Sequence, residues 1–275
     1  MSPYKLILDG VVRKNDFLVG KKKVIIPETK MIKYNCDDLV ENPITTNTNV
    51  IFNNMKTDEC AIYFLKNGLS KYVTVMNFAS KINCGGGYII NSRGQEEDLC
   101  KVMPALYYSL KEYVKYPFPG DSVLITPKIG ILRKNNKNYD MLDTQLDVGV
   151  VSASAPNLQH EYFDEERVKR TLKNMYCAVK KYIPDTDTLI LGAWGCGAYR
   201  NDPSRMAKIM NDINLKYGGH FKTIVFSVPD PNSENASEFK KHITLFTTSE
   251  TEKVTQLVNY KGSKIKKCWH DFIKI

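Results

Sequence analysis

The sequence has no cysteine or histidine pattern of the kind that builds a disulfide framework or a metal site. Its seven cysteines are an odd number, scattered along the chain without a C-x-x-C pair. This usage is typical of free thiols in a reducing compartment. The four histidines share no local metal-ligand spacing either. We therefore expect a protein without a structural metal, and a site without a metal.

Long apolar runs are also missing, and none reaches the length of a membrane span. The first residues, MSPYKLILDGVVRK, lack the charged lead and apolar stretch of a secretory signal. Together these absences favour a soluble intracellular protein, cytoplasmic or nuclear, and we expect a monomer. With 43% hydrophobic residues among 275, the chain can build one large domain or two small ones.

Positive charge is plentiful, but it is not arranged as in a nucleic-acid-binding protein. The net charge is +9, yet the lysines cluster only in KKK at 21–23 and KIKK at 264–267, without interleaved aromatic residues. A basic surface would equally suit a polyanionic substrate. Neither a P-loop nor a Rossmann glycine fingerprint occurs.

Residues 1–45 differ in pattern from the rest of the chain. Their short apolar runs, broken by Gly10, Gly20 and Pro27, predict strands or hairpins rather than a long helix. From about residue 46, predicted strands alternate with helices, which indicates a three-layer α/β domain with a mostly parallel sheet. The predicted strands are 72–79, 122–127, 147–154, 188–193 and 222–228. The predicted helices are Thr57–Lys66, 95–111, one opened by Asp164, one from Asp202-Pro203 to Gly218-Gly219, and one from a capping box of Asn235 and Glu238 to Phe246. The basic tail, 248–275, ends in apolar residues that could dock onto the body.

Two glycine-rich stretches follow predicted strands. The first is Gly85-Gly86-Gly87, and the second is LGAWGCGAYRNDP, with Gly192, Gly195 and Gly197. In such sheets ligands bind at the carboxyl ends of strands, where exposed backbone N–H groups can close around phosphate oxygens. For either stretch alone, an ordinary tight turn is the alternative interpretation.

Glu96 and Glu97 follow the first glycine stretch and open a predicted helix. Acidic residues in a first helical turn usually just complement the helix dipole. Adjacent helical residues point about 100° apart, however, so these two carboxylates cannot share one surface role. A pair in which one carboxylate anchors the substrate and the other transfers a proton is how glycosidic bonds are cleaved.

Several motifs, in order, carry a resemblance to a known family. VMNFASKINCGGG, then seven residues and QEED, then VVSASAPN, LGAWGCGAYRNDP and VFSVPDPN resemble the microbial-type poly(ADP-ribose) glycohydrolases. These enzymes are macrodomains marked by GGG followed closely by QEE. The resemblance covers about residues 46–246. It implies an α/β/α macrodomain over 46–247 with a mixed, mostly parallel sheet, an N-terminal extension over 1–45 and a C-terminal tail over 248–275.

The resemblance also implies a role for each matching residue. Glu97 matches the catalytic acid, and Glu96 would hold ribose hydroxyls beside the scissile bond. Asn77, Asn83 and Gln95 would shape the distal ribose pocket, with Tyr199 packing on that ribose. The diphosphate would lie on the backbone of two loops, Gly85-Gly86-Gly87 and Gly195-Cys196-Gly197-Ala198-Tyr199. The sequence departs from the family at Cys84, where proline is usual, at Gly94, where alanine is usual, and at Arg200, where glycine is common.

The implied activity is hydrolysis of the ribose–ribose O-glycosidic bonds of ADP-ribose polymers, without a metal or redox cofactor. We expect cleavage mainly from the chain end, releasing ADP-ribose, because Tyr199, Arg200 and the segment 88–90 lie on loops that could close the far side of the cleft. Three alternatives stay open: a macrodomain that only binds ADP-ribose, a hydrolase of mono-ADP-ribose on protein or nucleic acid, and a nucleic-acid-binding protein. The intact glutamate pair argues against the first of these.

Overall fold

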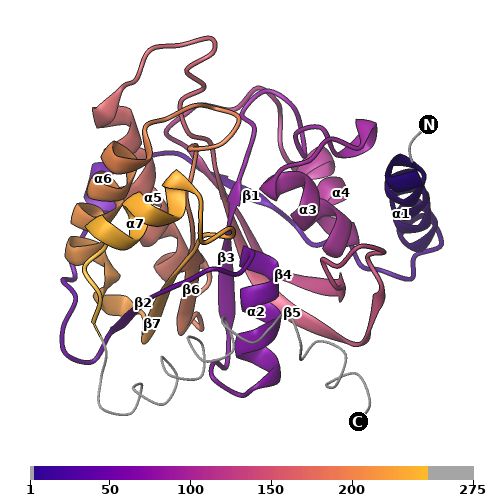
Figure 1. Ribbon diagram of the computed structural model, residues 1–275, viewed down its shortest axis with the longest axis horizontal. Helices are drawn as coiled ribbons and strands as arrows, with labels where there is room; N and C mark the ends of the chain where they lie inside the picture. Colours follow the sequence, from indigo (N-terminus) through magenta and orange to yellow (C-terminus); the bar gives the residue numbers. More distant parts are fainter. Residues whose placement is uncertain (1–2, 247–275) are drawn as a thin grey trace.

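One seven-stranded sheet organises the computed structural model, which describes residues 3–246 (Figure 1). The strand order is β1-β4-β5-β3-β6-β7-β2, with β5, β3, β6, β7 and β2 parallel and with β1 and β4 antiparallel to their neighbours. The predicted mixed, mostly parallel sheet is therefore confirmed. The strands are β1 (Lys30–Ile32), β2 (Asn49–Asn53), β3 (Val73–Phe78), β4 (Val123–Arg133), β5 (Met141–Ala153), β6 (Thr188–Leu191) and β7 (Thr223–Ser227).

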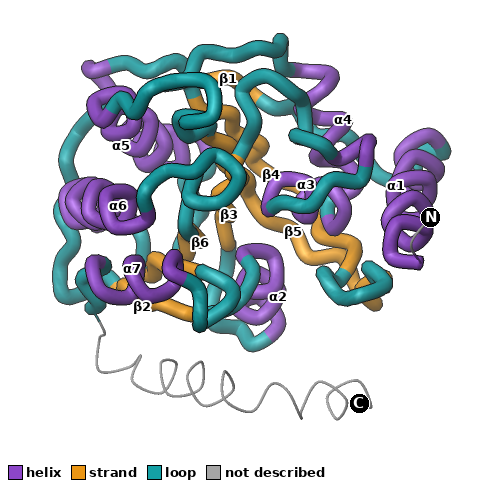
Figure 2. The backbone as a smooth tube through the Cα atoms, turned by 45° about the horizontal axis from the view of Figure 1, so that its top comes forward, coloured by secondary structure: helices purple, strands orange, loops and turns teal. Residues whose placement is uncertain are grey.

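Helices cover both faces of this sheet and complete the three layers. Helices α1 to α4 lie on one face and α5 to α7 on the other (Figure 2). Strand β3 shows why, because Val75 packs into the first core and Met76 into the second, the alternation of a strand buried on both sides. The helices are α1 (Pro3–Gly20), α2 (Thr57–Lys66), α3 (Gln95–Val102), α4 (Pro104–Tyr113), α5 (Glu165–Tyr182), α6 (Pro203–Tyr217) and α7 (Glu234–His242). None of the helices within residues 3–246 is both long and apolar enough to cross a membrane.

The helix starts predicted from capping residues are confirmed for α5 and α6. The carboxylate of Asp164 accepts a hydrogen bond from the Arg167 amide, and Asp202 caps α6 in the same way, with Pro203 at the first helical position. Helix α2 ends at Asn67, and Gly68 then takes the left-handed conformation with φ +64°.

The prediction for the N-terminal segment is wrong, because residues 3–20 form helix α1. Its buried residues, Leu8, Val11, Val12 and Val19, recur at helical spacing, and their packing outweighs the cost of Gly10 in the helix, about 1 kcal/mol relative to alanine.

The single helix predicted over 95–111 is two helices. Met103 adopts φ −115° and ψ 80° between α3 and α4, since a residue before proline avoids the helical region.

The last predicted helix is also misplaced at both ends. Its cap is Ser233, whose hydroxyl accepts from the Ala236 amide, and the helix ends at His242 rather than at Phe246. Strands β4 and β5 are longer than predicted because they pair as an antiparallel hairpin beyond the sheet. Strand β2 was not predicted at all. The proposed docking of the 248–275 tail lies outside the described residues.

Candidate active site

A cleft of about 590 Å³ lies beyond the carboxyl ends of β3, β5, β6 and β7. This is where ligands bind in open α/β sheets. The structure brings most of the predicted site residues to this cleft: Asn83, Gly86, Gly87, Gln95, Glu96, Glu97, Gly195, Gly197, Ala198 and Tyr199. Three predicted residues do not line it, namely Asn77, Gly85 and Cys196.

Glu96 is the buried member of the glutamate pair, with 3% of its surface exposed. Its carboxyl accepts a hydrogen bond from the Ser80 amide at 2.8 Å and one from Asn77 Nδ2 at 3.3 Å. Burial raises the pKa of Glu96 to about 8 in spite of these two donors, so the group carries a proton at neutral pH. Asn77 therefore contributes to the site by holding Glu96 and not by lining the cleft.

Glu97 sits on the first glycine stretch. Its Oε1 accepts a hydrogen bond from the Gly87 amide at 2.8 Å. A Cβ atom on Gly86 would lie 2.6 Å from Glu97 Oε1, and one on Gly94 would lie 2.3 Å from Oε2. The Glu97 carboxylate lies close to Gly86 and Gly94, where neither residue has a side chain.

The backbone of this stretch also requires glycine. Gly85 and Gly86 have φ of +64° and +58°, the left-handed region that glycine enters without strain. A Cβ atom on Gly85 would meet the Tyr107 ring at 2.8 Å. The Gly86 amide donates to the Asn83 carbonyl at 3.0 Å, so in this loop the amides of Gly86 and Gly87 already serve contacts inside the protein.

Gln95 braces the start of helix α3 against the sheet. Its Oε1 accepts from the Phe78 amide at 2.8 Å, and its Nε2 donates to the Met76 carbonyl at 2.7 Å and to Thr57 Oγ1 at 2.8 Å. These bonds join α3 to the end of β3 and to the start of α2. The helix that carries both glutamates is thereby fixed at its first residue.

The second glycine loop is built differently. Gly195 has φ +77°, and a Cβ atom there would lie 2.5 Å from Ala155 Cβ. Gly197 is exposed, and a Cβ atom on it would meet nothing within 4 Å. Cys196 donates to the Trp194 carbonyl and packs toward the second core. The open backbone of this loop is therefore at Gly197 and Ala198.

Tyr199 connects this loop to the glutamate pair. Burial raises the pKa of its phenol, hydrogen bonds with Ser80 and Ser154 lower it, and the nearby carboxyls of Glu96 and Glu97 raise it. Tyr199 thus lines the cleft near both carboxyls, and its packing on the distal ribose stays a prediction.

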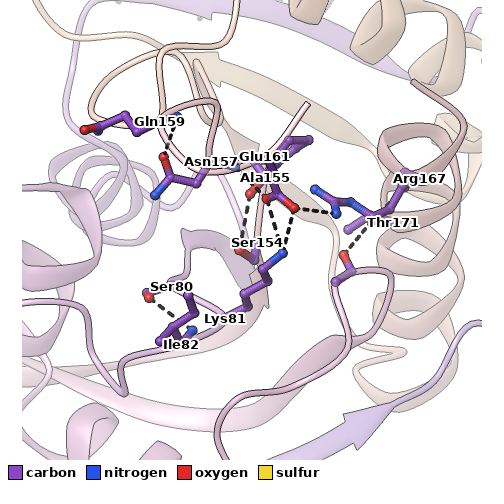
Figure 3. Close-up of polar contacts among 12 residues, drawn as sticks. Ser80, Lys81, Ile82, Ser154, Ala155, Asn157, Gln159, Glu161, Arg167 and Thr171 are labelled. Carbon is purple, nitrogen blue, oxygen red and sulfur yellow. Dashed lines mark hydrogen bonds and ion pairs between the residues drawn. The ribbon is translucent and has the colours of Figure 1, made fainter. Parts of the chain in front are cut away.

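An ion-pair cluster ties together two of the loops that form the cleft (Figure 3). Glu161 binds Lys81 Nζ at 2.9 Å and Arg167 Nη1 at 2.8 Å, and it accepts from the Asn157 amide at 2.7 Å. Although burial acts the other way, these donors lower the pKa of Glu161 to about 2. The cluster holds the turn after β3 beside the loop after β5, and sequence reasoning missed it because its members are far apart in the chain.

Comparison with known proteins agrees with this arrangement. Residues 20–128 match the family model "Microbial-type PARG, catalytic domain". The poly(ADP-ribose) glycohydrolase of Thermomonospora curvata has a similar structure, with a TM-score of 0.72 and 18% identity over 86% of this chain and 99% of that one. The resemblance to the microbial-type poly(ADP-ribose) glycohydrolases is confirmed. The Deinococcus radiodurans enzyme in complex with ADP-ribose matches with a TM-score of 0.64 and 22% identity, over 78% of this chain and 93% of that one. No curated protein matches in sequence.

The structure accounts for two departures from the microbial-type glycohydrolase pattern. Arg200 has φ +59°, the conformation in which glycine, common in the family at this position, is free of strain. Cys84 replaces the usual proline, and its Sγ contacts the Tyr107 carbonyl at 3.6 Å. Burial raises the pKa of Cys84 to about 12, so this thiol stays protonated and unreactive.

A polar cluster on the opposite edge of the cleft was also missed. Lys56 Nζ lies 3.0 Å from Asp98 Oδ2 and 2.9 Å from Asn135 Oδ1, and Asn135 Nδ2 donates to Asp58 at 3.1 Å. Burial raises the pKa of Asp58 to about 7. From the sequence, Asp58 looks like an ordinary first-turn acid of α2, and nothing local signals its burial under the β4–β5 hairpin.

Proposed function

We propose that this chain is a poly(ADP-ribose) glycohydrolase that hydrolyses the ribose–ribose O-glycosidic bonds of ADP-ribose polymers. The observation that carries the proposal is the pairing of a buried, protonated Glu96 with a Glu97 seated on a glycine loop at the wall of a ligand-sized cleft. The match to the microbial-type family model supports it. So does the fold shared with a Thermomonospora curvata glycohydrolase bound to the inhibitor ADP-HPD.

In this proposal the two glutamates have different roles. Glu97 lines the cleft and would donate a proton to the leaving ribose oxygen, and its carboxylate would then activate water against an oxocarbenium-like centre. Glu96 is buried, and burial raises its pKa to about 8, so it would be neutral near pH 7 and would hold ribose hydroxyls. The exposed backbone at Gly197 and Ala198 would receive the diphosphate, with Tyr199 against the distal ribose.

We also propose that cleavage occurs mainly from the chain end of the polymer. Residues 88–90 were expected to close the far side of the cleft. This expectation is wrong for Tyr88, because its side chain is fully buried in the first core. Tyr199 and the joined loops of Lys81 and Glu161 support closure instead. Early time points on long polymer test this mode: free ADP-ribose should appear while long chains persist, and rapid conversion to mid-length oligomers would contradict it.

The substrate class is tested by comparing three substrates with the purified protein. These are long poly(ADP-ribose), mono-ADP-ribosylated protein and mono-ADP-ribosylated DNA. We expect release of ADP-ribose from the polymer at a rate well above that from the other two. Release from a mono-ADP-ribosylated substrate alone would overturn the proposed function, and tight ADP-ribose binding without any release would indicate a binding module.

A further inference from the structure

Helix α1 lies against the part of the molecule that carries the glutamate pair. It packs on α3 and α4, on the side of these helices away from the central strands (Figure 2). Leu8, Val11 and Val12 enter the first core from this helix. All of α1 except its last residue lies before the segment that matches the family model.

Asn15 of α1 has no exposed surface and makes three long-range hydrogen bonds. Its Nδ2 donates to the Lys101 carbonyl at 3.0 Å and to the Tyr88 hydroxyl at 3.4 Å, while its Oδ1 accepts from Arg133 Nε at 2.9 Å. Tyr88 directly follows Gly87, whose amide holds Glu97, and Lys101 is on the same helix as Glu97. A single side-chain amide therefore connects both ends of the segment 88–101.

Two further contacts hold the middle of this segment. Asn91, which has φ +59°, donates a hydrogen bond from its Nδ2 to the carboxylate of Asp9 on α1. The buried ammonium of Lys101 donates to the Ser92 carbonyl at 3.0 Å. The turn between the glycines and QEE is thus fixed to α1 and to α3.

We propose that α1, through Asn15 and Asp9, positions the segment 88–101 and so sets the geometry of Glu97 on Gly87. Asn15 is a positioning residue, because it acts through Tyr88 and Lys101 and does not reach the cleft. The inference rests on the proposed function. Its physical basis is that a catalytic carboxyl needs sub-ångström placement, and displacement by about 1 Å can cost about 10²-fold in rate.

The matched control is Asn214, a second fully buried asparagine on the other face of the sheet. Its Oδ1 accepts from the Tyr176 hydroxyl at 2.9 Å, far from the glutamate pair. Truncating either asparagine removes a buried hydrogen-bonded amide, so both variants should lose thermal stability, and Asn15→Ala should lose more because it breaks three hydrogen bonds against one. Only the first should change catalysis.

The experiment measures kcat and KM on poly(ADP-ribose) at a temperature where all variants are folded, with hydrogen exchange of residues 85–98 alongside. For Asn15→Ala we expect about a tenfold lower kcat, a nearly unchanged KM and faster exchange, and for Asn214→Ala none of these. Asp9→Ala, at a half-buried site, should lower kcat by a smaller factor, and it decides the question if Asn15→Ala does not fold.

Wild-type kcat in folded Asn15→Ala, or in Asp9→Ala where Asn15→Ala does not fold, would overturn the inference. So would an equal loss of kcat in Asn214→Ala. Failure of the proposed function looks different, because the wild-type protein itself would then not cleave polymer. In that case hydrogen exchange alone decides whether α1 holds the segment: faster exchange specific to Asn15→Ala supports the inference, and unchanged exchange rejects it.

Discussion

The two glycine stretches look alike in the sequence but do different things in the structure. In the first, the Gly87 amide donates to the carboxylate of Glu97, and a Cβ atom on Gly86 would lie 2.6 Å from Glu97 Oε1. In the second, Gly197 faces open space with nothing within 4 Å. Glycine in the first loop makes room for the Glu97 side chain, and glycine at position 197 leaves an exposed stretch of backbone without a side chain.

In the proposed function this difference would separate catalysis from binding within one cleft. Changes at the first loop should act on Glu97 and lower kcat, since Glu97 is the residue proposed to transfer the proton. Changes at the second loop should act on the diphosphate and weaken affinity. The predictions below test that separation.

The largest effect is expected at Glu97 itself. Glu97→Gln keeps the size of the side chain and its acceptor for the Gly87 amide, but removes the proton-transferring group. We expect kcat on poly(ADP-ribose) to fall by about 10²–10⁴-fold while the affinity for ADP-ribose, measured by calorimetry, stays within about twofold. Turnover near the wild-type rate would show that Glu97 is not the acid.

A side chain added at Gly86 in the first loop, where it would push against Glu97, should have the next largest effect on kcat. Gly86→Ala introduces a methyl group against Glu97 Oε1 and strains a residue at φ +58°, so we expect kcat to fall by about 10–10²-fold with some loss of stability. Gly94→Ala is the control, because its φ of 172° suits any residue and alanine is usual at this position in the family that the chain resembles.

Gly94→Ala should keep kcat and the melting temperature close to the wild-type values, since the atom nearest to the added methyl group is the flexible end of the Glu97 side chain. A loss of kcat in Gly86→Ala that only tracks its loss of stability would assign the first loop a structural role only.

A substitution in the second loop should weaken ADP-ribose binding more than it lowers kcat. Gly197→Val places a branched side chain on the exposed backbone, where a Cβ atom has nothing within 4 Å, so we expect the fold to be unaffected. We expect ADP-ribose to bind about tenfold more weakly, with a smaller change in kcat. Gly195→Ala is unsuitable for this test, since its φ of +77° and its contact with Ala155 would disturb the loop itself. Unchanged affinity in folded Gly197→Val would remove the loop from the binding site.

The sequence predicted the parts of this molecule that depend on local pattern. The capped starts of α5 and α6 and the buried strand β3 follow from neighbouring residues, and the resemblance placed Glu96 and Glu97 at one cleft with the second glycine loop. It did not predict what depends on long-range packing. Helix α1 was missed because two glycines suggested turns, while its helical face is revealed only by the core that it covers.

In the candidate site, too, the sequence did not predict the contacts between residues far apart in the chain. Asn77 and Gln95 were predicted to shape the distal ribose pocket. Gln95 lines the cleft and Asn77 does not, but the amides of both are used inside the protein, on Glu96, on the end of β3 and on the start of α2. Whether a polar side chain meets a ligand or another residue depends on partners far away in sequence. Asn77 and Glu96 are 19 residues apart, and Lys81 and Glu161 are 80 apart.

The smallest effect that we predict is a pH dependence of stability arising from Glu96. Burial raises its pKa in the folded protein from 4.5 to about 8, so the folded state binds the proton more tightly than the unfolded chain does. Its contribution to stability is complete below about pH 4.5 and is lost as the pH rises toward about 8. Glu96→Gln does not titrate and should escape this loss.

Thermal unfolding of both proteins between pH 4.5 and pH 8 measures this difference. The melting temperature of Glu96→Gln should rise relative to that of the wild type across this window, by about 2–4 °C for each kcal/mol, and we expect at least about 1 kcal/mol in total. Asp58, whose pKa burial raises to about 7, is present in both proteins and cancels in the comparison. Glu166→Gln at an exposed position controls for the change in net charge. A difference that stays constant from pH 4.5 to pH 8 would mean that Glu96 is ionised across this range, and that it is not the neutral anchor of the proposed site.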